Sequence, residues 1–325
     1  MGNTCFKNLS ASELLEMTSH RNFCKLVRRE HNQVMGVPLR GTTANFSREE
    51  NSEKNRYIDI PCWDHSRVIV SNRESLVFDE DDWDSSRIVI TSERNASTYI
   101  HANYVDGFEA INKYICTQTP MENTWETFIK LIWEQNSRVV VSLTDLNKDN
   151  QKTYDLWVKP QGSETIIGRY VVKTLEISEE QIFTKTRLLI TNRTTETSKE
   201  ITNFWFTDWP DNTIPTGLEE FLDLRSEVNR EQFRLMMETE SNSRTPGPIV
   251  IHCSTGAGLT GTYCAIDNAL AQLDKESRVS IPQIVVKIRS QRHSSVFRPE
   301  QYAFCYKVLE HVLLAEAKKQ PKGYS

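Results

Sequence analysis

One segment restricts the fold of this chain more than any other: a short loop that joins a buried strand directly to a helix. Pro248–Ile251 is an apolar, β-branched run typical of a buried strand, and Thr260–Leu273 carries apolar residues at helical spacing. Between them, residues 252–261 read His-Cys-Ser-Thr-Gly-Ala-Gly-Leu-Thr-Gly. The glycines at 256, 258 and 261 permit a tight turn whose backbone N–H groups point inward. Such a nest at a helix N-terminus binds a tetrahedral oxyanion and favours a thiolate, so Cys253 is a candidate nucleophile.

Length and charge narrow the class of protein. The chain has 325 residues, enough for one large α/β domain with a substantial core. Its net charge of −5 argues against general nucleic-acid binding, so a phosphate site needs local positive charge. No apolar run of about 18 residues is present, so we expect no membrane span.

Cysteine usage and the N-terminus suggest where the protein works. Residues 1–19 contain no long apolar stretch of the kind that a secretory signal requires. The seven cysteines show neither metal-ligand spacing nor a paired framework, which suits a reducing compartment. We therefore expect a cytoplasmic protein without a metal or other cofactor.

Patterning along the rest of the chain predicts one mixed α/β domain. Residues 1–33 form a helical lead-in in this interpretation, residues 34–315 the domain, and residues 316–325 a Lys-rich frayed tail. Alternating apolar residues with Thr-rich turns predict an antiparallel meander from Thr153 to Phe206. Further expected strands are Tyr99–Tyr104, Lys113–Thr117 and Arg138–Leu143, and further expected helices are Leu9–Gln33, Thr124–Gln135, Thr216–Met237, Ile281–Gln291 and Pro299–Ala315.

Several segments agree in order and spacing with one known family. Besides the His-Cys loop, they are Lys54–Ile60, Tyr99–Gly107, Tyr114–Pro120, Trp133–Gln135, Trp209–Asp211 and Gln301–Phe304. Together they resemble the motifs of the protein tyrosine phosphatases, whose signature is His-Cys-x5-Arg. The resemblance implies a single phosphatase domain with a highly twisted mixed sheet flanked by helices.

The same resemblance implies roles for individual residues. Cys253 would be the nucleophile that attacks phosphorus, and Asp211 the general acid that protonates the leaving phenolate. Tyr57 would stack on the phosphotyrosine ring, Asp59 would accept hydrogen bonds from the peptide backbone, and Gln301 would help to bind the substrate. We expect His252 to hydrogen-bond the backbone and tune the thiol rather than act as a base. The phosphate loop would consist of His252, Ser254, Thr255, Gly256, Ala257, Gly258, Leu259 and Thr260.

Leu259 is the most serious departure from the family pattern, because it stands where the family has arginine. The planar fork of that arginine binds two phosphate oxygens and stabilises their charge during transfer. Each hydrogen bond to a charged group is worth about 1.5–3 kcal/mol, so the loss amounts to about 3–6 kcal/mol, or roughly 10²–10⁴ in rate.

Two further departures affect the same mechanism. Phe297-Arg298 stand where the family has a Gln-Thr pair whose glutamine positions the hydrolytic water, and Phe297 cannot orient water. The segment 145–149, which resembles the loop whose glutamate contacts the arginine, contains no glutamate. Arg298 is expected to be a solvated surface residue rather than a replacement cation.

Three interpretations remain open at this point. A catalytically inactive phosphatase would bind phosphotyrosine proteins or compete with active phosphatases, which the intact recognition loop beside a disabled catalytic loop favours. An enzyme with weak residual turnover is the second, because Cys253 and Asp211 are both present. The third is a scaffold in which Cys253 is a redox-sensitive thiol or has no role. Nothing in the sequence favours a particular oligomeric state.

The departures also resemble a particular group within the family, the tyrosine-phosphatase-like proteins encoded by bracoviruses of parasitoid wasps. In that group some members keep the signature and others lose it. The resemblance implies action on host signalling in the cytosol of infected cells.

Overall fold

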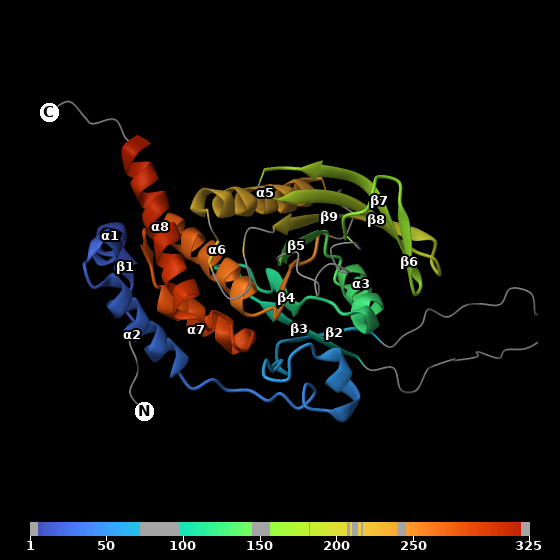
Figure 1. Cartoon of the computed structure of the whole chain (residues 1–325), viewed down its shortest axis with the longest axis horizontal. Helices are drawn as coiled ribbons and strands as arrows, with labels where there is room; N and C mark the ends of the chain where they lie inside the picture. The colour runs from blue at the N-terminus through green and yellow to red at the C-terminus, as the bar shows by residue number, and fades with distance from the viewer. Residues whose placement is uncertain are drawn as a thin grey trace, which may run out of the picture.

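The computed structural model contains a nine-stranded mixed sheet with helices on both faces (Figure 1). It describes residues 6–71, 98–144, 157–181, 183–206, 209, 214–215, 217–238 and 245–319. The strand order is β2-β3-β4-β10-β5-β9-β8-β7-β6, and β1 and β11 form a separate pair. The strands are β1 (Leu9–Ser10), β2 (Arg67–Ile69), β3 (Tyr99–Val105), β4 (Tyr114–Gln118), β5 (Val139–Leu143), β6 (Glu164–Ile167), β7 (Tyr170–Glu179), β8 (Thr184–Asn192), β9 (Thr197–Phe206), β10 (Ile249–Cys253) and β11 (Arg278–Val279).

The centre of the sheet is parallel and fully covered. β10 pairs in parallel with β4 and β5, and β5 pairs in parallel with β9, whereas the remaining neighbours are antiparallel. Every residue of β5 and β10 is buried, as expected for continuous apolar runs that face helices on both sides. The carboxyl end of β10 therefore opens onto the loop that follows Cys253.

The sheet divides the hydrophobic core into two layers, one on each of its faces. Ile249 and Ile251 face the larger core with helices α1, α2 and α5 to α8, while Val250 faces the smaller core under α3. This alternation follows from the two-residue period of a strand. The helices are α1 (Ala11–Ser19), α2 (Phe23–Met35), α3 (Trp125–Glu134), α5 (Leu218–Met237), α6 (Gly258–Glu276), α7 (Ile281–Gln291) and α8 (Pro299–Lys319), with 3₁₀ turns η1 (Glu49–Lys54) and η2 (Glu122–Thr124).

The sequence prediction of a single mixed sheet flanked by helices is confirmed, with two differences in the helices. The lead-in predicted as helical over Leu9–Gln33 forms two helices, because Ser10 opens α1 with a capping box and the chain becomes extended at His20. α8 runs on to Lys319, four residues into the segment predicted as a frayed tail. Residues 315–319 read Ala-Glu-Ala-Lys-Lys, which are strong helix formers. Among the described helices, none is long and apolar enough to cross a membrane.

Candidate active site

The loop after β10 forms the nest that the sequence predicts. Cys253 ends the strand with 1% of its surface exposed, and the Gly256 N–H donates to its Sγ over 3.2 Å. Gly256 has φ +65°, and a Cβ there would lie 2.2 Å from the Thr117 carbonyl. Gly258 needs its small size instead, because a Cβ would lie 2.8 Å from Gln301 Nε2 and 2.9 Å from Phe297 Cε1. The thiol thus sits at the base of a turn that only glycine allows at position 256.

Arg292 holds this loop from behind, a role that the sequence analysis missed. Its side chain is fully buried and donates to the carbonyl oxygens of Thr255 and Gly256, at 3.0 and 2.9 Å. It also contacts Asn103 Oδ1 and His101 Nδ1 on β3. Because these two loop carbonyls point toward the guanidinium, the N–H groups of the loop face the opposite side of the turn. No local pattern distinguishes Arg292 from its neighbouring arginines, so only the tertiary contacts identify it.

His252 is a neutral positioning residue. Burial lowers its pKa to about 3, and the charge of Arg56 contributes in the same direction. Its Nε2 lies 2.8 Å from the Ser142 hydroxyl, which itself donates to Asn203, so Nε2 carries the proton. Thr119 contacts the other ring nitrogen at 3.3 Å. The expectation that His252 bonds to backbone is therefore wrong: its partners are hydroxyl groups, which lie on the adjacent strand and loop.

The recognition segment around Tyr57 is attached to the same strands. The Tyr57 hydroxyl lies 2.6 Å from Ser254 Oγ in the loop. Gln118, which pairs with Cys253 in the sheet, accepts from the Arg56 N–H and donates to the Lys54 carbonyl. This amide fixes the segment around Tyr57 to the strand beside Cys253, a contact that the sequence motif alone does not reveal.

A cleft of about 370 Å³ opens over the loop and brings most of the predicted site residues together. Its charged lining among the described residues consists of Asp59 and Arg298. Leu259 and Phe297 also line it, so apolar groups face the place where the family has a cation and a water-positioning amide. Arg298 is half-buried in this wall, with its guanidinium carbon 5.5 Å from the Phe297 ring, rather than a solvated surface residue as expected. The lining consists of Tyr57, Asp59, Ile60, Cys253, Ser254, Thr255, Gly258, Leu259, Ser294, Phe297, Arg298 and Gln301.

The wall that presents Phe297 is built from strained backbone. Ser294 and Val296 have φ values of +60° and +52°, a region that costs a β-branched residue about 1–3 kcal/mol. Val296 is held there because its N–H donates to the Ala257 carbonyl and its carbonyl lies 3.0 Å from His31 Nε2. α2 is thus linked directly to the wall of the cleft.

Two predicted elements can be placed only in part. Trp209 is fully buried and packs against Phe221 and Phe304, with ring centroids 5.5 and 5.9 Å away. Asp211, the candidate general acid, and the segment 145–149 lie outside the described residues. Thr260 is fully buried, and its hydroxyl has no hydrogen-bond partner in the described part of the chain.

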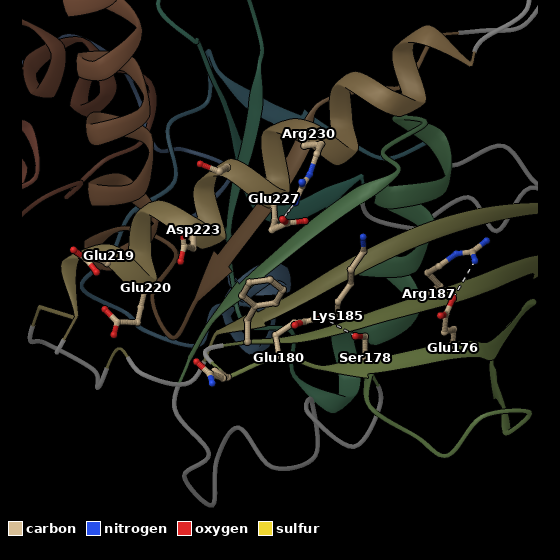
Figure 2. Close-up of a pocket in the computed structure, with 13 residues that line it drawn as sticks. Glu176, Ser178, Glu180, Lys185, Arg187, Glu219, Glu220, Asp223, Glu227 and Arg230 are labelled. Atoms are coloured by element: carbon tan, nitrogen blue, oxygen red, sulfur yellow. Dashed lines mark hydrogen bonds and ion pairs between the residues drawn. The ribbon is translucent and has the colours of Figure 1, made fainter. Parts of the chain in front are cut away.

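A larger cavity of about 880 Å³ lies elsewhere, between α5 and strands β7 and β8 (Figure 2). Among the described residues, six carboxylates and three cations line it, and Arg187 and Arg230 form ion pairs with Glu176 and Glu227. The described lining residues include neither a cysteine nor a histidine. Size alone therefore does not identify the candidate site, because the candidate nucleophile Cys253 lies in the smaller cleft.

Known proteins match this chain over most of its length. The sequence model described as protein-tyrosine phosphatase matches residues 51–311. Tyrosine phosphatase H3 of Microplitis demolitor bracovirus is 49% identical over 97% of this chain and 98% of its own length. Tyrosine phosphatase-like protein H1 of the same virus is 44% identical over 97% of this chain and 88% of its own. Human tyrosine-protein phosphatase non-receptor type 9 is 34% identical over 80% of this chain and 41% of its own length. The chain therefore belongs to the protein-tyrosine phosphatase family.

Proposed function

We propose that this chain is a catalytically impaired phosphatase that binds phosphotyrosine proteins, or competes for them with active phosphatases, in host signalling. The observation that supports this most strongly is that Leu259 and Phe297 both line the cleft over Cys253. An apolar side chain beside a phosphate dianion provides no hydrogen bonds to offset its desolvation. The Phe297 side chain, which lies close to Gly258, has no amide with which to direct a hydrolytic water.

The proposal that the cleft binds phosphotyrosine is supported by the loop and the Tyr57 segment, which keep the groups that such binding needs. The nest keeps its inward turn at Gly256, Tyr57 reaches the loop through Ser254, and Asp59 stands exposed at the rim. In this proposal Tyr57 contacts the ring of the phosphotyrosine and Asp59 accepts N–H groups of the peptide. Gln301 is buried but lines the same cleft, and in this proposal it helps to bind the substrate. We further propose a cytoplasmic location, in the host cell cytosol by analogy with the bracovirus relatives.

A paired binding measurement tests the proposal. We expect the protein to bind a phosphotyrosine peptide at least about tenfold more tightly than the same peptide with plain tyrosine, because amide N–H groups bind a charged acceptor more strongly. Asp59→Asn should weaken phosphopeptide binding by about 5- to 30-fold, the loss of a charge-assisted hydrogen bond. Asp223→Asn, an equally exposed acid on α5, is the matched control and should leave affinity unchanged. Equal affinity for the two peptides would contradict the proposal and leave the scaffold interpretation.

Weak residual hydrolysis is the second candidate function. It is favoured by the presence of Cys253 at the base of the cleft, where its Sγ accepts from the Gly256 N–H. In that case Cys253 attacks phosphorus, the tyrosine oxygen leaves, and the cysteinyl-phosphate intermediate is hydrolysed slowly. Turnover of an aryl phosphate clearly above that of Cys253→Ser would select this alternative.

A further inference from the structure

Thr255 places its own hydroxyl among the N–H groups of the loop. Its Oγ1 accepts from the Ala257 N–H over 3.2 Å and from the Gly258 N–H over 3.5 Å. The same oxygen lies 3.9 Å from Cys253 Sγ, and Thr255 lines the cleft. The hydroxyl therefore lies close to the thiol in the wall of the same cleft.

These two amides belong to the start of a long helix. α6 begins at Gly258, and the first N–H groups of a helix have no partner within it. Ala257 occupies the cap position and has no side-chain oxygen to accept from them. The Thr255 hydroxyl supplies that acceptor from within the loop, in the manner of a Ser/Thr turn.

We propose that Thr255 is a specificity-determining residue whose hydroxyl fills part of the anion position, so that only a strongly charged phosphoryl group displaces it. This inference rests on the proposed function of the loop as a phosphotyrosine site. A phosphoryl oxygen is a better acceptor than a hydroxyl because its hydrogen bonds are charge-assisted. The neutral hydroxyl of an unmodified tyrosine gains nothing by the exchange. Leu259 provides no cation. The competition between the Thr255 hydroxyl and a phosphoryl oxygen for the Ala257 and Gly258 N–H groups therefore determines much of the affinity for phosphate.

The test compares three forms of the full chain: the natural protein, Thr255→Ala and Thr255→Ser. Inorganic phosphate is titrated into each while the amide resonances of Ala257 and Gly258 are followed by NMR. Thr255→Ala should bind phosphate about 3- to 10-fold more tightly, the equivalent of one net hydrogen bond. Thr255→Ser, which keeps the hydroxyl, should match the natural protein within about twofold.

Hydrogen exchange without ligand gives a second readout that does not depend on phosphotyrosine binding. The amides of Ala257 and Gly258 should exchange faster in Thr255→Ala than in the other two forms. Unchanged phosphate affinity together with unchanged exchange would overturn the inference, as would a Thr255→Ser variant that behaves like Thr255→Ala. A natural protein that ignores phosphopeptides while its Thr255→Ala variant shows faster exchange would refute the proposed function but retain the hydroxyl contact.

Discussion

Replacing Leu259 by arginine and Phe297 by glutamine together is expected to raise aryl phosphate hydrolysis by about 10²–10⁴-fold over the natural chain. Leu259 is 2% exposed and lines the cleft, so a longer side chain at this position can extend into that space. The guanidinium would then bind two phosphoryl oxygens and stabilise the charge that develops during transfer to Cys253. Steady-state hydrolysis at saturating substrate measures the gain.

The single variants separate the two chemical steps. Leu259→Arg alone should form the cysteinyl-phosphate but release phosphate slowly. It should therefore give a burst of about one equivalent of the aryl leaving group per protein molecule. Leu259→Lys is the matched control, because it supplies a charge without the planar fork and should recover much less. The double variant that also carries Cys253→Ser should show no hydrolysis of the aryl phosphate. A folded double variant that is no faster than the natural chain would show that the defect lies outside these two positions.

Replacing Asp267 by asparagine is expected to lower the free energy of unfolding by about 3–5 kcal/mol, the cost of breaking a buried ion pair on one side. Asp267 on α6 is 1% exposed and contacts Lys113 Nζ at 2.5 Å and Arg225 Nε at 2.6 Å. Tyr114 and Asn229 donate to the same carboxylate. The substitution leaves two cations without their anion and loosens α6, whose first turn completes the predicted phosphate loop. Chemical denaturation measures the loss, and Asp274→Asn, an exposed acid on the same helix, should change it by less than about 0.5 kcal/mol.

The same carboxylate predicts a pH dependence with a definite sign. Lys113 and Arg225 hold the pKa of Asp267 well below its ordinary value of 3.8, although burial alone would raise it. A depressed pKa in the folded state means that the stabilisation is complete at neutral pH and is lost as the pH falls toward the folded value. The stability difference between the natural chain and Asp267→Asn should therefore be constant above about pH 5 and shrink below about pH 4. A difference that grows on acidification would contradict this assignment.

Local patterns in the sequence predicted the framework of the site. The apolar run before Cys253 and the periodic helix after it place the thiol at the end of a central strand, and the structure has this arrangement in β10 and α6. Strand alternation and helical spacing depend on neighbours in the chain, so they can be recognised without tertiary information.

Contacts between distant segments could not be predicted in the same way. Arg292 contacts Thr255 and Gly256 across 37 and 36 positions of the chain, and His252 contacts Ser142 across 110. Arg298 joins the cleft wall because the strained backbone at Val296 turns the chain there. The glycines illustrate the same limit: all three were expected to serve the tight path, but only Gly256 has a positive φ, and Gly258 and Gly261 instead permit close packing.

The central claim, binding without turnover, can be tested in one ³¹P NMR experiment. A phosphotyrosine peptide is mixed with an equal amount of the natural protein, and its phosphorus resonance is followed over hours beside a Cys253→Ser sample. The account predicts a shifted resonance for the bound phosphate and no inorganic phosphate beyond that of the Cys253→Ser sample. Inorganic phosphate that accumulates with the natural protein but not with Cys253→Ser would show a working phosphatase and contradict the account.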